Sequence, residues 1–236
     1  MATTALIPQS ESRLIASLWH TLLVLVFLFL ISAAGHGWLT PVLKGRPNAR
    51  VMTYTLTIAV EWFMFFLIWL GIRNRGTRMV DLIGGSWPTV KAILRDLGIA
   101  IAFLAVCFVV LGLISHLLKS EPPEAVRRIL PRTGAECAVW VVLSLTAGIC
   151  EEVIFRGYLQ RQFAALTKSV ALGIVLQGIV FGAAHGYQGW KLMVVIVVFG
   201  CFFGLLANWV RSLRPGMMAH FLQDSVNGLL AGRFVK

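Results

Sequence analysis

Charged side chains are scarce in this sequence. Only 13% of its 236 residues are Asp, Glu, Lys or Arg and only ten are acidic, whereas 58% are hydrophobic. Soluble domains carry about 25% charged and roughly 45–50% apolar residues. A chain with so few polar groups cannot cover itself in water. This composition excludes an ordinary soluble protein and indicates that lipid is the main solvent.

Two further absences narrow the function. The sequence contains neither CxxC nor a zinc-ligand spacing, and we interpret its cysteines as small packed side chains: Cys107, Cys137, Cys150 and Cys201. The net charge is +11, but Lys and Arg lie between apolar runs and form no basic face or tail. This placement excludes nucleic-acid binding and favours contact with anionic lipid headgroups.

Seven apolar segments approach the length of a membrane-spanning helix, about 20 residues. They cover 14–38, 51–72, 97–118, 136–155, 170–185, 192–210 and 217–230. We therefore predict an all-α fold, a polytopic transmembrane helical bundle of about seven spans in the cell membrane. The loops of the two sides hold 11 and 10 Lys and Arg residues, so the positive-inside rule does not set the orientation.

A proline-containing linker over 119–134 divides the chain into 1–130, with N-terminal transmembrane helices and linkers, and 135–230, which is rich in intramembrane polar groups. Ionisable side chains inside a membrane are costly and mark function by default. Acidic residues in or beside the apolar segments are Glu61, Glu136, Glu151, Glu152 and Asp224. Glu136 suits a helix start. The last three share the C-terminal part with Arg156, His185 and His220.

The first polar group is an acidic pair followed by an arginine. On a helix, Glu152 and Arg156 share a face, with the acid in the favourable N-terminal position. Glu151 points about 100° away and remains an unpaired carboxylate, which can act as a general base on water. The alternative is a buried ion pair beside a glutamate at a helix end.

The other two groups are histidines on the next apolar segments. His185 follows small residues at the end of its segment, which indicates either a site residue with open space or an interfacial histidine. His220 and Asp224 are four residues apart and share a helix face. They can orient an imidazole, hold a polarised carbonyl oxygen, bind a metal or form an interhelical hydrogen bond. Polar groups on three consecutive segments together predict an active site.

These residues form three short patterns in order. Glu151, Glu152 and Arg156 match EExxxR, and the chain continues as FRGYLQ over 155–160. Phe181 and His185 match FxxxH, and His220 with Asp224 matches HxxxN or HxxxD. Over 135–230 the sequence resembles the CPBP family of intramembrane proteases, also called the ABI domain. That family includes type II CAAX prenyl endopeptidases and lysostaphin-resistance-like proteins. Eukaryotic-type CAAX proteases usually carry Asn at the position of Asp224, which weakens the expectation of a prenylated substrate.

The resemblance implies peptide-bond hydrolysis inside the bilayer, with 135–230 as the catalytic core and the active site between the C-terminal helices. Glu151, assisted by His185, would activate the attacking water. Glu152 with Arg156 would position that carboxylate, and His220 with Asp224 would stabilise the oxyanion. Because an ionised aspartate repels an oxyanion, we expect Asp224 to orient His220 or to be protonated.

We expect a glutamate-type mechanism without a cofactor, since the sequence has no HExxH, although two Glu, two His and one Asp also form a possible zinc-ligand set. The expected partners are a membrane-associated protein or peptide substrate and the lipid bilayer, with no nucleic acid. One alternative is a transporter with a proton relay through the same polar residues, and another is a non-catalytic scaffold or immunity protein. Glu61 matches no motif, and we expect it to make an interhelical hydrogen bond.

Overall fold

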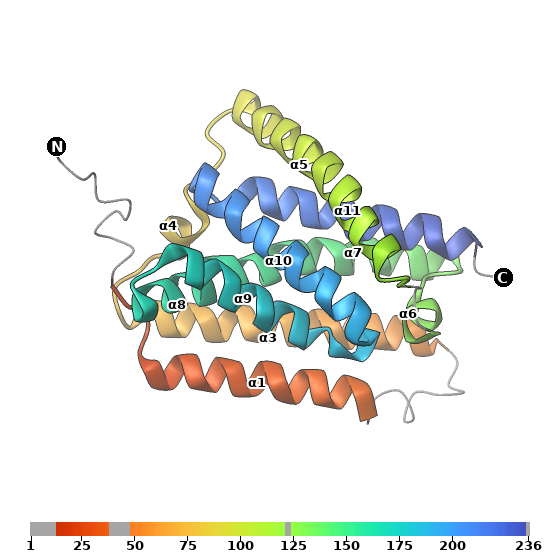
Figure 1. Ribbon diagram of the computed structural model, residues 1–236, viewed down its shortest axis with the longest axis horizontal. Coiled ribbons are helices and arrows are strands. Elements are labelled where there is room, and N and C mark those ends of the chain that lie inside the picture. Colours follow the sequence, from red (N-terminus) through yellow and green to blue (C-terminus); the bar gives the residue numbers. More distant parts are fainter. Residues whose placement is uncertain (1–12, 38–47, 121–123, 235–236) are drawn as a thin grey trace.

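The computed structural model describes residues 13–37, 48–120 and 124–234, which form helices and connecting turns without a β-strand (Figure 1). The long helices are α1 (Leu18–Gly37), α3 (Ala49–Arg73), α5 (Val90–Leu117), α7 (Gly134–Glu151), α9 (Val170–Ala184), α10 (Trp190–Val210) and α11 (Arg214–Phe234). The short elements are α4 (Met79–Ile83), α6 (Glu124–Ile129), a π-helix η2 (Glu152–Leu159), α8 (Gln160–Thr167) and a 3₁₀ turn η3 (Gly186–Gln188).

The fold class predicted from the sequence, a helical membrane bundle, is confirmed. Each of the seven apolar segments coincides with a long helix. Among the described residues, four helical stretches are long and apolar enough to cross a membrane: Ala49–Arg73, Val90–Leu117, Gly134–Thr167 and Trp190–Val210. Leu18–Ala34 and Val170–Ala184 are shorter apolar helices. The number of seven spans therefore stays a prediction. Two boundaries differ most from the prediction. Helix α5 begins at Val90 and not at 97, and the helical run expected to end at 155 continues through η2 and α8 to Thr167.

The helices run back and forth between two ends of the bundle, which we call the α4 end and the α6 end (Figure 1). At the α4 end, the backbone N–H of Leu213 donates to Ile83 O at 2.8 Å. Gln162 Oε1 accepts from the backbone N–H groups of Ile15 and Ala16 at 2.8 and 3.3 Å. These bonds bring the start of α1 and the start of α11 to the same end as α4, although they are far apart in sequence.

At the α6 end, α3 and α7 begin side by side. Thr133 caps α7 in a reciprocal capping box with Glu136, which confirms that Glu136 lies at a helix start. Arg50 Nη1 lies 3.3 Å from Glu136 Oε1, and one turn further the rings of Tyr54 and Trp140 meet edge to face with centroids 5.3 Å apart. The two helices are therefore parallel neighbours.

Helix α7 also packs closely against α11. The indole N–H of Trp140 donates to the backbone oxygen of Asp224 at 2.9 Å. A Cβ atom added to Gly148 would lie 2.8 Å from Met217 O and 3.0 Å from Phe221 N. Only a glycine allows this approach of the two backbones. Helix α7 is thus the central helix between α3 and α11.

Helices α9 and α10 approach each other through glycines, as the GxxxG spacing in the sequence indicates. A Cβ on Gly178 would lie 2.6 Å from Cys201 Sγ, and a Cβ on Gly182 would lie 2.9 Å from Met193 O. Helix α5, by contrast, crosses one side of the bundle over α10 and α11 (Figure 1). Its apolar side chains are largely exposed, as suits contact with lipid.

A buried carboxylate attaches α5 to the rest of the bundle. Asp96 is fully buried, and its oxygens accept from Trp87 Nε1 at 3.0 Å and from Arg95 Nη2 at 2.7 Å. Arg214 Nε, at the start of α11, lies 3.2 Å from Asp96 Oδ2. We call this group of four residues the Asp96 clasp. It joins the first turns of α5 and α11.

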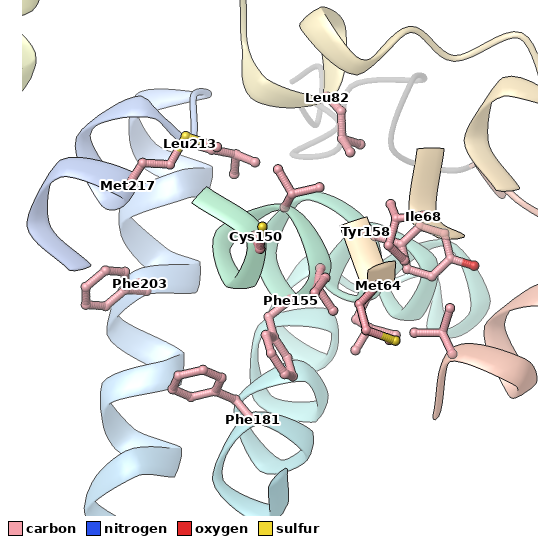
Figure 2. Packing of buried hydrophobic residues seen from close by; sticks show 14 of the residues in the cluster. Met64, Ile68, Leu82, Cys150, Phe155, Tyr158, Phe181, Phe203, Leu213 and Met217 are labelled. Carbon is pink, nitrogen blue, oxygen red and sulfur yellow. The ribbon is translucent and has the colours of Figure 1, made fainter. Parts of the chain in front are cut away.

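Aromatic side chains fill the core beside the junction of α7 and η2. Figure 2 shows Phe155 and Phe181 directed toward each other, and their rings meet edge to face at 4.8 Å. Phe199 and Phe203 of α10 continue this wall, with ring centroids 4.3 Å apart. The wall separates the polar groups of the site from the outer surface of α9 and α10.

Candidate active site

The site begins where α7 becomes a π-helix. Glu151 is the last residue of α7, Glu152 is the first of η2, and every residue of η2 is buried. A π-helix makes i→i+5 hydrogen bonds and is rare outside short insertions in α-helices, which frequently occur at functional sites. Gly157 allows close packing here, since a Cβ would lie 3.0 Å from Leu213 Cδ1. The wider turn places residues 152 and 156 on the same side of the helix.

Glu152 and Arg156 form an ion pair in the interior. Arg156 Nη1 lies 2.9 Å from Glu152 Oε1, and both side chains are fully buried. The guanidinium also lies over the rings of Phe181 and Phe203, at 4.4 and 5.1 Å from their centroids. The pairing expected from the four-residue spacing is present. It compensates two charges that would otherwise be costly away from water.

His220 is the residue that joins the acidic groups. Its Nδ1 lies 3.3 Å from Glu152 Oε1, while its Nε2 lies 3.6 Å from both Glu151 Oε2 and Asp224 Oδ2. The ring is 4% exposed and has the rings of three phenylalanines around it, at centroid distances of 6.2 Å for Phe181, 6.0 Å for Phe199 and 5.6 Å for Phe203. This aromatic surround fixes the imidazole between carboxylates on both sides.

Glu151 is the carboxylate without a cation partner. Its Oε2 is buried and makes no hydrogen bond within the described chain. The contact to His220 Nε2, at 3.6 Å, is longer than a hydrogen bond. An unpaired buried oxygen beside an imidazole is free to accept a proton from water, which is the chemistry required of a general base.

His185 occupies the C-terminal cap of α9. Its Nδ1 lies 2.9 Å from the backbone oxygen of Phe181, so a neutral ring that donates there leaves Nε2 as an acceptor. His185 interacts electrostatically with Asp224, but among the described residues no hydrogen bond joins it to Glu151. The neighbour of Glu151 is His220. The assistance of Glu151 by His185, inferred from the family resemblance, therefore stays a prediction.

Two residues outside the sequence motifs also face this cluster. The Glu61 carboxyl group, on α3, interacts electrostatically with Glu151 and Asp224. Its Oε2 is buried without a hydrogen bond, so the expected interhelical hydrogen bond is not found at this oxygen. Tyr187, in η3, faces the same three carboxyl groups, and burial raises the pKa of its phenol. In the sequence, only the position of Glu61 in the middle of an apolar segment indicated that it could belong to the site. No sequence pattern indicated Tyr187.

The site does not have the arrangement of a metal centre. Across the described residues, no three His, Cys, Asp or Glu side chains are placed to hold an ion. Glu151 Oε2 and Asp224 Oδ2 each lie 3.6 Å from the same nitrogen of His220, Nε2. The expectation of a mechanism without a cofactor stays a prediction.

Comparison with known proteins bears on the same region. Residues 133–226 match the family model described as "Type II CAAX prenyl endopeptidase Rce1-like". The chain is also 30% identical over 88 residues to YpbD of Bacillus subtilis (strain 168), which is described as uncharacterised; the match covers 36% of this chain and 42% of YpbD. The chain thus spans less than half the length of this relative. No solved structure matches.

The matched segment contains every site residue that the sequence motifs indicated: Glu151, Glu152, Arg156, His185, His220 and Asp224. It begins at the capping residue of α7 and ends within α11. Helix α3, with Glu61, lies outside it. Over residues 133–226, the chain is thus similar to the Rce1-like family of type II CAAX prenyl endopeptidases.

Proposed function

We propose that this protein is an intramembrane endopeptidase that hydrolyses a peptide bond of a membrane-associated protein or peptide. The observation that carries the proposal is the unpaired, buried oxygen of Glu151 beside His220, within the segment that matches an endopeptidase family. The neighbouring carboxylate, Glu152, is neutralised by Arg156 and leaves Glu151 as the available base.

In the proposed reaction, Glu151 accepts a proton from water as the water oxygen attacks the scissile carbonyl carbon. The carbonyl oxygen becomes an oxyanion, which accepts a hydrogen bond from Nε2–H of His220. Glu151 then returns its proton to the leaving nitrogen, and the C–N bond breaks. His185, whose Nε2 remains an acceptor, would hold the second proton of the attacking water. Atoms and protons balance without another reactant.

Glu152 and Asp224 serve His220 in this scheme. Glu152 lies 3.3 Å from Nδ1 and fixes the ring orientation. Asp224 lies 3.6 Å from Nε2, the atom that is to face the oxyanion. Because a charged Asp224 would repel the oxyanion, its proposed role is to hold His220 before the substrate arrives, or to act as a protonated donor.

The substrate is proposed only by class. The family description favours a prenylated peptide of the CAAX type as the first probe. At position 224, however, this chain has aspartate where eukaryotic-type CAAX proteases usually carry asparagine. A peptide without a lipid is therefore the necessary second probe.

The test is cleavage of a peptide panel by the purified protein in detergent, followed by mass spectrometry. Farnesylated and unmodified CAAX peptides are compared for wild type and Glu151→Gln, each with and without a chelator. We expect Glu151→Gln to lower kcat by about 10²–10⁴-fold, as loss of a general base does, and the chelator to have no effect. Glu124→Gln is the matched control, since Glu124 pairs with Arg128 on the surface.

Three results would change the proposal. Activity that the chelator removes and zinc restores would assign a metalloprotease. Full activity of Glu151→Gln would exclude Glu151 as the base. A well-folded wild type that cleaves no peptide would contradict an endopeptidase and favour the proton relay or the non-catalytic scaffold.

A further inference from the structure

Helix α3 lies outside the family segment, yet its register against α7 is well defined. Arg50 contacts Glu136 at 3.3 Å, and Tyr54 contacts Trp140 with ring centroids 5.3 Å apart. In both contacts the partners are 86 positions apart in the chain. The two parallel helices therefore keep the same register over this turn.

The same offset places Glu61 opposite Ala147, one helical turn before Glu151. Ala147 is buried and small, and so leaves space for a longer side chain from α3. The electrostatic contacts agree with this register, because Glu61 interacts with Glu151 and Asp224, and Cys150 interacts with both Glu61 and Glu151. Glu61 thus lies within electrostatic range of the proposed base, on a helix that none of the three motifs includes.

Neither carboxyl group of this pair has a cation. Glu61 Oε2 and Glu151 Oε2 are both buried without a hydrogen bond, and Arg156 is already paired with Glu152. The other titratable groups around the pair are Cys150, Glu152, Arg156, His185, Tyr187, His220 and Asp224. Two neighbouring carboxylates away from water cannot both be charged at low cost, and a single shared proton relieves the repulsion.

We propose that Glu61 is a positioning residue of this site, whose protonated carboxyl group donates a hydrogen bond to Glu151 and holds it toward the attacking water. The proposal rests on the proposed role of Glu151 as the base. Glu61 keeps its proton throughout the reaction. The proton taken from water passes to Glu151 and then to the leaving nitrogen, so Glu61 changes the placement of the base and adds no step.

Kinetics of Glu61→Gln and Glu61→Leu test this role. An amide N–H can replace the carboxyl O–H as donor, so Glu61→Gln should keep kcat within about threefold of wild type. Glu61→Leu should lower kcat roughly tenfold with KM unchanged, the effect of one lost hydrogen bond in the transition state. Thr57→Val is the matched control: Thr57 lies one turn earlier on α3 and bonds only Thr53 O, at 3.0 Å.

A chemical measurement locates the proton without a substrate. Dicyclohexylcarbodiimide forms adducts with protonated carboxyl groups in apolar surroundings. Peptide mapping by mass spectrometry should find the adduct at Glu61 in wild type and none at residue 61 in Glu61→Gln. An adduct at Glu151 in place of Glu61 would reverse the assignment and overturn the inference.

The outcomes separate this inference from the proposed function. Wild-type kcat in Glu61→Leu, or equal losses of kcat in the Gln and Leu variants, would overturn the positioning role while Glu151 stays the base. Thermal unfolding of each variant in detergent shows whether a loss of kcat is a loss of folded protein. If wild type cleaves no peptide of the panel, the proposed function fails and this inference fails with it.

Discussion

At the residue scale, the site depends on how two adjacent glutamates are distinguished. Glu152 is fully buried and has Arg156 at 2.9 Å, whereas the side chain of Glu151 is 17% exposed and has no cation. Both point toward His220, from opposite sides of its ring. The Glu152 carboxylate is thus held in the buried ion pair, whereas Glu151 keeps an oxygen without a hydrogen bond.

The ion pair makes a first prediction. Glu152→Gln should lower the free energy of unfolding by about 3–5 kcal/mol, because it leaves the buried Arg156 without a counter-charge. The double variant Glu152→Gln/Arg156→Met should recover most of that stability but not the activity, since His220 loses the charged acceptor beside Nδ1. Denaturation of the purified variants in detergent, with the single variant Arg156→Met completing the cycle, measures the coupling. Purely additive costs would show that the pair does not act as a unit.

Residue types and spacing were sufficient to predict which side chains gather in the C-terminal helices. They did not show that His220 lies next to Glu151, because this depends on how α11 packs against α7. They also did not single out Glu61. Its position near Glu151 follows from the register of α3 against α7, in which paired residues are 86 positions apart in the chain. Spacing along one helix predicts shared faces, but contacts between helices depend on packing.

At the element scale, the close approach of α7 and α11 determines the geometry of the site. Gly148 precedes Glu151 by three residues, and its contacts on α11 flank His220. Any side chain at this position pushes apart the two helices that carry the proposed base and the proposed oxyanion donor.

Gly148→Ala should therefore lower both stability and kcat. The added Cβ would lie 2.8 Å from Met217 O, and overpacking of this kind costs about 1–3 kcal/mol. Gly112→Ala on α5 is the control, since a Cβ there meets nothing within 4 Å. We expect Gly112→Ala to match or exceed wild type in thermal unfolding and to match it in activity. A harmless Gly148→Ala would mean that α7 and α11 can separate without cost.

The elements that the sequence predicted well are those whose signals are local. Apolar runs indicated the seven long helices, prolines marked the linker around α6, and Glu136 marked the start of α7. The π-helix over 152–159 was missed, and with it the continuation of the fourth segment to Thr167. The 3.6-residue period carries no information about a stretch with i→i+5 bonds, whose existence depends on buried tertiary contacts.

At the scale of the whole molecule, the Asp96 clasp holds together the first turns of α5 and α11. Helix α5 otherwise has few buried residues, so this polar group is a large part of its attachment. The same clasp anchors Arg214, six residues before His220.

Asp96→Leu should lower the thermal midpoint of unfolding, because it strands Arg214 in a buried position and removes an acceptor from Trp87. Asp81→Leu is the matched control. Asp81 pairs with Arg78 on the surface, where the hydrogen bonds from Arg78 lower the pKa of its carboxyl group. Loss of that exposed pair should leave the thermal midpoint unchanged, because surface ion pairs commonly contribute little to stability. Equal midpoints for the two variants would contradict a structural role of the clasp.

The two ends of the bundle predict a topology. In a variant without native cysteines, Arg75→Cys and Lys168→Cys lie at the α4 end and should react with a membrane-impermeant maleimide from one side of the membrane. Glu124→Cys lies at the α6 end and should react from the other side. Labelling of intact cells and of inverted vesicles distinguishes the sides. Reaction of all three from one side would exclude a bundle whose helix axes cross the bilayer.

The bonds of Gln162 also have a consequence for biosynthesis. Gln162 accepts from the N–H groups of Ile15 and Ala16 at the start of α1, and 146 residues separate Gln162 from Ala16. At ribosomal speeds of about 5–20 residues per second, roughly 7–30 seconds pass before this acceptor is even synthesised. During that interval α1 is without this partner. Helix α1 thus docks late, and the nascent chain must be kept from other hydrophobic partners until α8 arrives.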